Sequence, residues 1–497
     1  MKKQLFFIAV LFFSYSYLKA TTWNVGSTRT YTLPSQIKNL VNDGDTVYID
    51  GGIYSNDATK WIKKGLKFIG LGTGSNRTIL QYNGDIPNGK GIWVFELAGT
   101  SDDAYVENIV FDGAQISNSN GANGAGIRYQ ANNITVINCK FMNCQNGILE
   151  GNGSVTTSNV VIKNSEFQNN GYQLQNDPTY SGYEHNIYIS ASADTLLVQN
   201  CYFHDPRGQA NSLKTRAQRS YILYNLIDEA AGYGSWELDI AQGGLNIIIG
   251  NIIVQGAAGA NHGIVGYDAA VNTLEDFYFV NNTVINQYVG NIKYFNTVPS
   301  SGINTYKIYN NIFASVAGAS NTMYSGNTPG VLDSSNNINA INYLTLGFTN
   351  PSTDDYSLTA ASTAVIDKGT NAGATNTLYS LTPFNMYQSF NTTLLPRSII
   401  GASIDVGAYE YNASADIFSV NKASAIKIYP NPSNGEFFVE VEKKTKIELY
   451  NSLGEMILET ETQNKILLNE TKLADGIYFF RITQGEKTFS KKLLVQK

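Results

Sequence analysis

The sequence lacks the features on which several large classes of protein depend. Its 497 residues include only three cysteines and three histidines, and charged residues make up 15% of the chain. The net charge is −6 and no basic tract is long enough to follow a phosphate backbone, which excludes a nucleic-acid partner. No GxSxG elbow, phosphate-cradling glycine loop or pair of CxxC motifs occurs. Serine hydrolysis, nucleotide use and structural zinc therefore lack support.

The three cysteines cannot form a full disulfide framework because their number is odd. Cys139 in NCKF and Cys201 in NCYF occupy matching positions of a repeat, and Ser165 of NSEF takes that position between them. If these are successive stacked coils, the two sulfurs lie two strand spacings, about 10 Å, apart. That separation exceeds the reach of a disulfide. We therefore expect small buried thiols, and Cys144 has no assigned role.

Long apolar runs are confined to the N-terminus. Lys2 and Lys3 precede an apolar stretch from Leu5 to about Phe13, and Ala20 ends a small-residue cleavage motif. This pattern is typical of a secretory signal peptide. No later stretch approaches the roughly 20 apolar residues of a spanning helix, so we expect an exported protein without a transmembrane anchor.

Glycine and tyrosine are abundant, with 45 and 32 residues, which favours short strands joined by tight turns. A short amphipathic helix is predicted from Ser35 to Val41, and alternating apolar residues then predict strands from Thr46 to Asp50 and from Leu66 to Gly70. This region resembles the N-terminal cap of right-handed parallel β-helix proteins, in which a helix covers the open end of the coils. Such a cap protects a bare sheet edge.

A repeat begins near Val106, in which an apolar strand is followed by Asn and a second short apolar strand. Successive Asn residues are 25 to 36 positions apart, a scatter typical of coils whose turns carry loops of variable length. Asn tolerates the left-handed backbone of a tight corner, and its amide can bond to the next Asn of a stack. The predicted fold is all-β, a right-handed parallel β-helix. The Asn series comprises Asn108, Asn138, Asn164, Asn200, Asn225, Asn251, Asn282 and Asn310.

A further strand recurs before each Asn. Because side chains alternate along a strand, the residues just before and just after an inward position are expected to face solvent. Equivalent positions on neighbouring coils would lie about 4.8 Å apart. The inward series is Ile127, Ile148, Ile187, Leu213, Leu238, Ile264 and Ile292. The outward pairs include Asn186 with Tyr188, Ser212 with Lys214, Glu237 with Asp239, and Gly263 with Val265.

Two regions at the C-terminus depart from this repeat. The motifs DYSLTAASTAVIDKGTNAG and IDVGAYEY resemble the closing segment of secreted β-helix proteins, which packs on the last coils. In residues 426–497, alternating strands and turn signals predict a small antiparallel sandwich. YPNPSNG, DGIYFFRI and KKLLVQK there resemble the C-terminal sorting domain of the type IX secretion system of Bacteroidetes. The resemblance implies contact with that machinery, export through the periplasm and outer membrane, and surface attachment or release.

The sequence thus predicts five parts. They are a signal peptide at 1–20, the capped β-helix at 21–320, a closing segment at 321–411, a linker at 412–425 and the sorting domain at 426–497.

Charges of both signs and all three histidines gather between Glu184 and Tyr267. A β-helix with this export signal resembles the pectate-lyase-like superfamily, whose members mostly act on acidic polysaccharides. That resemblance implies β-elimination from a uronate chain. The reaction needs a cation against the carboxylate, a base for the C5 proton and a donor to the leaving oxygen.

Lys214 and Arg216 lie two residues apart and would share one face of a strand. Arg216 could bind a carboxylate through two hydrogen bonds. Lys214 could act as the base if the guanidinium lowers its pKa, or it could form a salt bridge with acids of the next coil. His204 and His185 are alternative proton carriers.

Glu237 and Asp239 allow a different chemistry. Two outward carboxylates on one strand have Cα atoms about 7 Å apart, which is compatible with the acid and base of a glycoside hydrolase. They could instead supply half of a Ca²⁺ site, completed by Glu184 or Asp268.

Three functions stay open from the sequence: a lyase, a glycosidase, and a surface protein that binds or adheres to glycans without turnover. We expect a monomer in each case. Residues expected to contact the acidic polysaccharide are His185, Tyr188, Arg207, Trp236, His262 and Tyr267.

Overall fold

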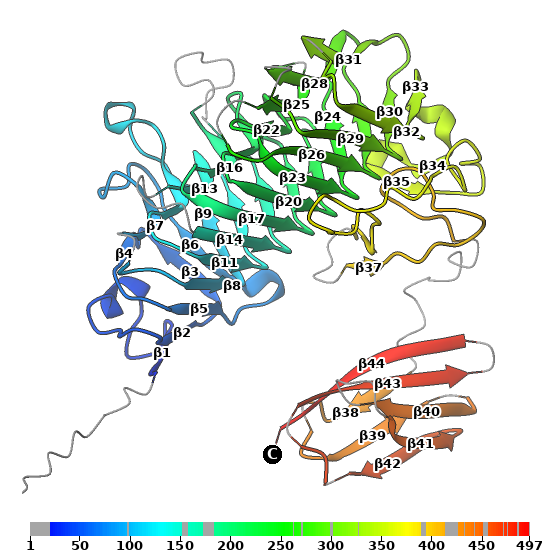
Figure 1. Cartoon of the computed structure of the whole chain (residues 1–497). Helices are drawn as coiled ribbons and strands as arrows, with labels where there is room; N and C mark the ends of the chain where they lie inside the picture. Colours follow the sequence, from blue (N-terminus) through cyan, green and yellow to red (C-terminus); the bar gives the residue numbers. More distant parts are fainter. Residues whose placement is uncertain are drawn as a thin grey trace, which may run out of the picture. The chain divides into compact units, whose positions relative to one another are not determined.

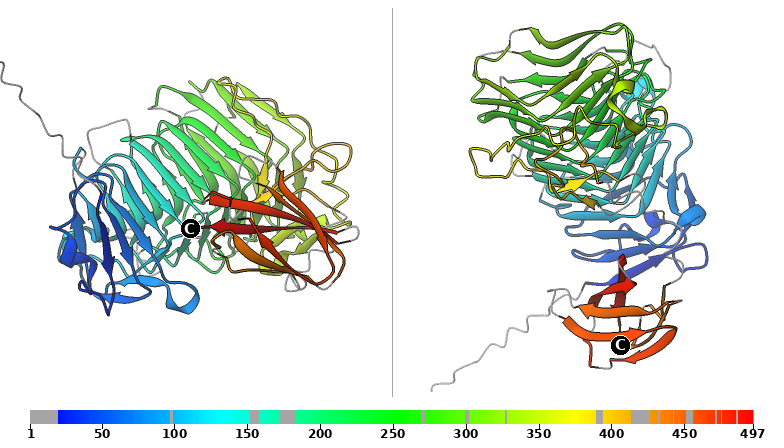
Figure 2. Two further views of the ribbon diagram at one scale, coloured as in Figure 1. Left: turned by 90° about the horizontal axis from the view of Figure 1, so that it is seen from below. Right: turned by 90° about the vertical axis from the view of Figure 1, so that its right-hand side faces the viewer.

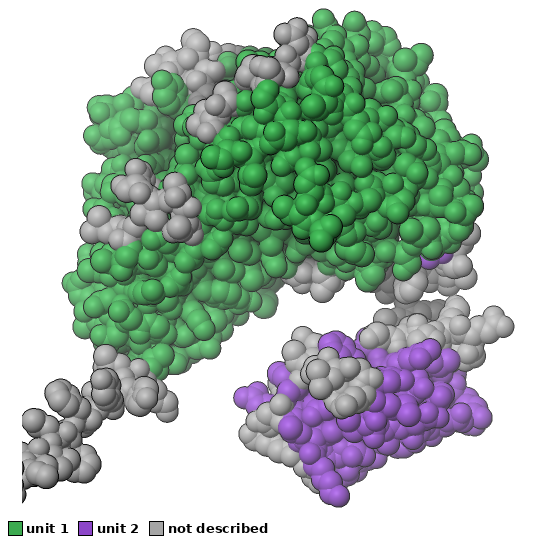
Figure 3. Space-filling view, viewed as in Figure 1, with its two compact units in different colours: residues 1–411 green, residues 412–497 purple. Residues whose placement is uncertain are grey.

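The computed structural model divides into two compact units, residues 1–411 and 412–497 (Figure 3). It describes residues 20–96, 99–151, 158–171, 183–261, 263–269, 272–298, 302–326, 328–388, 394–412, 426–431, 433–441, 443–450, 456–470, 472–474, 476–484 and 487–496. Most of the predicted signal peptide and linker lies outside these residues. No helix in the described part of the chain is both long and apolar enough to cross a bilayer.

Unit 1 is a parallel β-helix, as the sequence predicts (Figure 1). One coil shows the path: β19 (Asn211–Thr215), β20 (Arg219–Leu223) and β21 (Leu226–Asp228) follow one another and belong to three different sheets, and β22 (Leu238–Ile240) returns to the sheet of β19. Each strand pairs in parallel with its equivalents one coil earlier and later. Figure 2 shows these strand stacks from two further sides.

The three sheets are named A, B and C here. Sheet A contains β1 (Thr22–Val25), β2 (Thr46–Ile49), β5 (Lys67–Gly70), β8 (Ala104–Glu107), β11 (Ile134–Ile137), β14 (Ser158–Lys163), β17 (Ala193–Gln199), β20, β23 (Gly244–Ile249), β26 (Glu275–Val280), β29 (Thr305–Tyr309) and β32 (Leu332–Ser335). Sheet B contains β3 (Gly52–Ser55), β6 (Thr78–Gln81), β9 (Ile109–Asp112), β12 (Lys140–Met142), β15 (Glu166–Gln168), β18 (Tyr202–His204), β21, β24 (Ile252–Gln255), β27 (Thr283–Asn286), β30 (Ile312–Ser315) and β33 (Ile338–Ala340). Sheet C contains β4 (Thr59–Trp61), β7 (Gly91–Phe95), β10 (Ala125–Tyr129), β13 (Asn146–Glu150), β16 (His185–Ile189), β19, β22, β25 (Gly263–Asp268), β28 (Asn291–Val298) and β31 (Ser320–Gly326). The coils therefore continue to β33, past the boundary expected at residue 320.

The interior is a column of stacked apolar side chains. Four phenylalanines from successive coils, Phe111, Phe141, Phe167 and Phe203, lie with ring centroids 5.0, 5.0 and 4.8 Å apart. All three cysteines are buried and free, as predicted for Cys139 and Cys201. Each side chain repeats the environment of its equivalent one coil away, so the strand spacing also sets the spacing of the core.

Asn recurs at two adjacent positions of the corner between sheets A and B. The Asn series predicted from the sequence mixes residues of the two positions. Asn108, Asn138, Asn164, Asn200 and Asn310 do adopt the left-handed backbone, with φ between 51° and 58°. In the coils between those of Asn200 and Asn310, the residues with this left-handed backbone are Tyr224, Gly250 and Asn281. Asn225, Asn251 and Asn282 come one residue later and form a buried ladder that continues through Asn311 and Asn337. In it the backbone N–H and side-chain amide of one Asn donate to the Oδ1 of the next.

The predicted helix from Ser35 to Val41 is reduced to a single 3-10 turn, η1 (Pro34–Ile37). So short a segment does not recover the cost of helix nucleation through hydrogen bonds. Tertiary contacts hold it instead, because Ile37 and Val41 are buried in the core at the first coils.

The closing segment covers the outer faces of sheets A and B in the later coils. Its Tyr356, Val365 and Val406 pack on Leu226 and Ile252 of sheet B in one buried cluster. A second cluster joins its Ala372 and Leu381 to outward residues of sheet A. In Figure 1 this yellow segment runs along the green coils. Two short hairpins lie within it, β34 (Phe348–Asn350) with β35 (Asp355–Leu358) and β36 (Asn385–Met386) with β37 (Leu395–Pro396).

Unit 2 has the two antiparallel sheets expected of a small sandwich. One contains β38 (Lys427–Tyr429), β39 (Glu436–Glu440) and β42 (Lys465–Asn469). The other contains β41 (Met456–Thr462), β40 (Thr445–Tyr450), β43 (Gly476–Gln484) and β44 (Lys487–Val495). Its buried residues form a core of their own.

Candidate active site

A row of outward side chains crosses sheet C, one from each coil. Successive Cα partners are Arg128 with Leu149, Leu149 with Tyr188, Tyr188 with Lys214, Lys214 with Asp239, and Asp239 with Gly266. The residue on either side of each member along its own strand is buried, because the strands alternate. We call the members Arg128, Tyr188, Lys214 and Asp239 the outward row.

Lys214 is held by the acid of the next coil. Its Nζ lies 2.8 Å from Oδ2 of Asp239, and the two side chains are only 17% and 16% exposed. Asn211 donates from Nδ2 to the same Oδ2 at 2.7 Å. Of the two possibilities left open by the sequence, the structure therefore has the salt bridge. An amine committed to a carboxylate in this way does not present a free base to a substrate.

Tyr188 lies between aromatic and cationic neighbours. The imidazole of His185 stacks on its ring with a centroid separation of 5.5 Å and an interplanar angle of 18°. The guanidinium carbon of Arg216 lies 5.5 Å from the centroid of the same ring. Burial, together with the charges of Lys214 and Arg216, holds the pKa of His185 well below its ordinary value. This histidine is therefore neutral and, being almost fully buried, supports Tyr188 from beneath.

Arg128 belongs to the site and was missed from the sequence. It stands alone in AGIRY, two coils before Tyr188, with no charged neighbour in the chain to mark it. Burial lowers its pKa, whereas Tyr188 and Glu150 act in the opposite direction. The outward row thus has one guanidinium before Tyr188 and, with Arg216, another after it.

Glu237 does not face solvent, contrary to expectation. Asn186, Ser212 and Glu237, the residues that precede the inward positions of their coils, are all buried. The parallel pairing skips this position, as between His185↔Asn211 and Ile187↔Leu213, so the regular alternation of inward and outward side chains begins only after it. Burial, followed by the charges of Glu229 and Asp228, raises the pKa of Glu237 well above its ordinary value. A carboxyl group with no exposed surface cannot contact a polysaccharide, so Glu237 and Asp239 are not a glycosidase pair.

The predicted register also fails at the last two members of the inward series, Ile264 and Ile292. Leu238 pairs with Val265, and Val265 with Phe295, so Val265 and Phe295 are the inward residues in place of Ile264 and Ile292. Tyr267 is consequently inward and only 2% exposed. Its hydroxyl donates to Glu275 at 2.9 Å, which makes it a core residue and not a substrate contact.

Trp236 lies against the outer face of sheet C. A Cβ added at Gly263 would approach its ring to 2.5 Å, and one added at Gly266 would lie 3.5 Å from it. Glycine at both positions therefore leaves room for the indole. The ring is half-buried beside Asp239 and extends the site by one coil.

The remaining predicted residues lie elsewhere. His204 belongs to β18 in sheet B, where its Nε2 lies 3.1 Å from Glu166 and its Nδ1 2.8 Å from Asp205. Hydrogen bonds to Asp205 and Glu166 raise its pKa against the opposing effect of burial. Arg207 follows in the loop between β18 and β19, and His262 lies outside the described residues.

Carboxylates of the predicted calcium set are not brought together. Glu184 and Glu237 are buried, whereas Asp239 is in the outward row. Within the ranges that the structure describes, no three His, Cys, Asp or Glu side chains are arranged to hold a metal ion. Calcium binding stays a prediction from the sequence.

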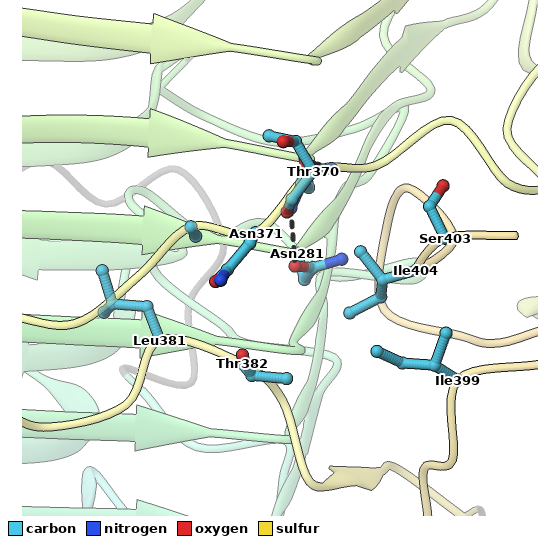
Figure 4. A pocket seen from close by; sticks show the side chains of 10 residues that line it. Asn281, Thr370, Asn371, Leu381, Thr382, Ile399, Ser403 and Ile404 are labelled. Atoms are coloured by element: carbon cyan, nitrogen blue, oxygen red, sulfur yellow. Dashed lines mark hydrogen bonds between the residues drawn. The ribbon is translucent and has the colours of Figure 1, made fainter.

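The structure also contains a cavity of about 300 Å³ between the coils and the closing segment (Figure 4). Its wall includes Asn281, Asn310, Leu381 and Ile404 and carries no titratable side chain. Asn310 donates to the carbonyl of Thr370 and to Asn281. These amides join the coil corner to the closing segment, so the cavity is a packing feature apart from the outward row.

Comparison with solved structures agrees with the fold. The crystal structure of pectate lyase Pel9A matches with a TM-score of 0.51 and 15% identity, over 79% of this chain and 97% of that one. A tailspike protein, gp49 of the Acinetobacter baumannii bacteriophage Fri1, described as a capsular polysaccharide depolymerase, matches with a TM-score of 0.34 and 9% identity, over 96% of this chain and 78% of that one. At these identities the first likeness shows the parallel β-helix alone. No curated protein matches this sequence.

Comparison with protein families gives a match for the second unit. Residues 427–496 match the family described as "Secretion system C-terminal sorting domain". The match covers the strands of the two antiparallel sheets from β38 to β44. The chain is therefore an exported parallel β-helix protein, secreted or attached to the cell surface, whose C-terminal unit is a secretion system sorting domain.

Proposed function

We propose that this protein is a polysaccharide lyase that cleaves a uronate-containing acidic polysaccharide by β-elimination on the outer face of sheet C. The observation that carries the proposal is the outward row itself, in which the ion-paired Lys214 adjoins Tyr188 and guanidinium groups approach Tyr188 from two coils. The likeness of fold to a pectate lyase is consistent with it.

Arg128 and Arg216 supply the positive charge that the reaction needs. A guanidinium binds a carboxylate through two parallel hydrogen bonds and stays charged at any physiological pH. Neutralising the uronate carboxylate in this way stabilises the negative charge that develops when C5 loses its proton.

Lys214 acts as the proton donor in this proposal. Asp239 holds its ammonium group in an ion pair across the row. As the bond between C4 and the glycosidic oxygen breaks, the ammonium delivers a proton to that oxygen. General acid catalysis of this kind contributes about 10² to 10⁴-fold to a rate.

The geometry opposes hydrolysis by Glu237 and Asp239. Glu237 has no exposed surface and Asp239 is occupied by Lys214 and Asn211. Retention of a glycan without turnover is the remaining alternative, and the experiment below separates it from catalysis.

The experiment offers purified protein a panel of alginate, pectate and glycosaminoglycans, with Ca²⁺ and with a chelator. It records ultraviolet absorbance of the new C4=C5 double bond together with the release of reducing ends. We expect unsaturated product on at least one uronan and a fall of about 10²-fold or more in Lys214→Ala.

The matched control is Arg219→Ala, which removes a partly exposed cation paired with Asp194 on sheet A. It should leave product formation unchanged. Reducing ends without double bonds, or glycan retention without any product, would overturn the lyase proposal.

A further inference from the structure

The proton acceptor of this reaction is not supplied by the predicted bases. The amine of Lys214 is committed to its ion pair with Asp239. His204 is on sheet B, paired with Glu166 and Asp205. His185 is beneath Tyr188 and 2% exposed, too deep to touch a polymer lying on the sheet.

Tyr188 is the one member of the outward row that is neither a cation nor the carboxylate paired with Lys214. The imidazole of His185 stacks on its ring, and the guanidinium of Arg216 lies over the ring, 5.5 Å from its centroid. Its Cα is the direct partner of Lys214 across the β16–β19 pair, so the two side chains leave the sheet as neighbours about 4.8 Å apart at the backbone.

Positive charge reaches Tyr188 from both sides along the coil axis. Arg128 is two strands before it and interacts with it electrostatically, and Arg216 follows the next strand. Lys214 adds a third cation within one strand spacing. Tyr188 therefore has three cationic neighbours in the site, which would stabilise negative charge that develops on a reacting group.

We propose that Tyr188 is the catalytic base that removes the C5 proton of the uronate; this inference rests on the proposed lyase function. The phenolate oxygen takes the proton from C5, and the C–H electron pair becomes the C4=C5 double bond. The C4–O bond breaks, and its oxygen takes a proton from the Lys214 ammonium. The phenol then returns a proton to the neighbouring amine directly or through water, which restores both groups without a co-reactant.

The assignment gives each side chain of the site a separate task. The guanidinium groups hold the carboxylate, Tyr188 accepts the proton, and Lys214 donates one to the leaving oxygen. Base and acid stand on adjacent strands, which suits the adjacent positions of C5–H and the C4 oxygen in the sugar.

The test is Tyr188→Phe in the full-length protein, assayed on the uronan that gives the strongest product with the wild type. Phenylalanine retains the ring that packs on His185 and Arg216 and removes only the hydroxyl. We expect kcat to fall by about 10²-fold or more. KM and retention on an affinity gel of the same uronan should stay within a few-fold of the wild type.

Tyr183→Phe is the matched control, since this tyrosine lies five residues earlier in the chain and is 67% exposed. It should behave as the wild type. Thermal unfolding of each variant establishes that it is folded. If Tyr188→Phe does not fold, Tyr188→Trp replaces it, because tryptophan also retains an aromatic ring and lacks the hydroxyl, and its kcat should fall to a similar extent.

The outcomes separate the two proposals. If the wild type forms unsaturated product and the kcat of Tyr188→Phe stays within a few-fold of the wild-type value, the role of Tyr188 is overturned and the lyase proposal stays intact. A Tyr188→Trp kcat within a few-fold of the wild-type value would do the same. Absence of unsaturated product from the wild type on every uronan would overturn both.

Discussion

Outward side chains of the coils have opposite environments on sheets B and C. On sheet B the outward positions of the later coils are apolar, as at Leu226, Ile252 and Ile312, and the closing segment covers them. On sheet C the corresponding positions are Tyr188, Lys214 and Asp239, which remain partly exposed. Burying a side chain such as Leu or Ile stabilises a fold by about 1.5–3 kcal/mol. The apolar face therefore gains from being covered, whereas the charged face stays available to a ligand.

The comparison predicts that the covered side governs stability and the open side governs activity. Substitutions under the closing segment should change unfolding far more than turnover. Substitutions in the outward row should do the reverse.

The largest effect on stability is expected from Arg397→Met. Arg397 is fully buried in the closing segment and donates to Glu410 at 3.0 and 3.1 Å, and to the carbonyls of Gly407 and Asp405 at 2.9 Å each. Its loss leaves Glu410 buried without its cation, which costs about 3–5 kcal/mol. Denaturant unfolding measures the change.

Arg219→Met serves as the control, because its pair with Asp194 is 40% and 33% exposed and should contribute little. Equal unfolding midpoints for Arg397→Met and Arg219→Met would contradict the role given to the closing segment.

A smaller, pH-dependent effect is expected from Glu237→Gln. Burial and the charges of Glu229 and Asp228 raise the pKa of Glu237 above its ordinary value of 4.5, so the folded protein retains a proton that the unfolded chain releases. The stability associated with protonated Glu237 is therefore present at pH values below about 4 and is lost as the pH rises.

Glutamine has no proton to lose, so Glu237→Gln should raise the thermal midpoint relative to the wild type at about pH 8 and have little effect at about pH 4. Glu229 and Asp228 remain in the variant, and their pKa values are raised as well, so part of the pH dependence should persist. A variant that is less stable than the wild type at the higher pH would show instead that Glu237 is held there as a stabilising anion.

The sequence predicts the coil architecture well because each coil repeats the same local pattern. An apolar strand, a corner residue and a second apolar strand are sufficient to predict the β-helix. The corner itself is less predictable, since Tyr224 and Gly250 occupy the left-handed position where the pattern suggests Asn. Asn225 and Asn251 come one residue later and serve the buried ladder instead.

The site is predictable only where the register holds. Alternation places Tyr188, Lys214 and Asp239 correctly. The predicted register fails at Val265 because the preceding residue, Ile264, is also apolar and buried. From the sequence, either residue of this pair could be given the inward position. The ion pair of Lys214 with an acid of the next coil was one of two possibilities open from the sequence. Arg128 was missed because its partners lie in other coils. Part of the cover over sheet B likewise comes from far along the chain, since the backbone N–H of Ala408 donates to Thr283.

The location of the ligand on sheet C is the central claim, and amide hydrogen exchange tests it most directly. Exchange would be compared in the full-length protein with and without a saturating oligouronate, using Lys214→Ala to prevent turnover. We expect new protection in β16, β19 and β22 and in the loop that carries Trp236, with none in β18, β21 or residues 427–496. Protection confined to sheet B or to the sorting domain would contradict the account.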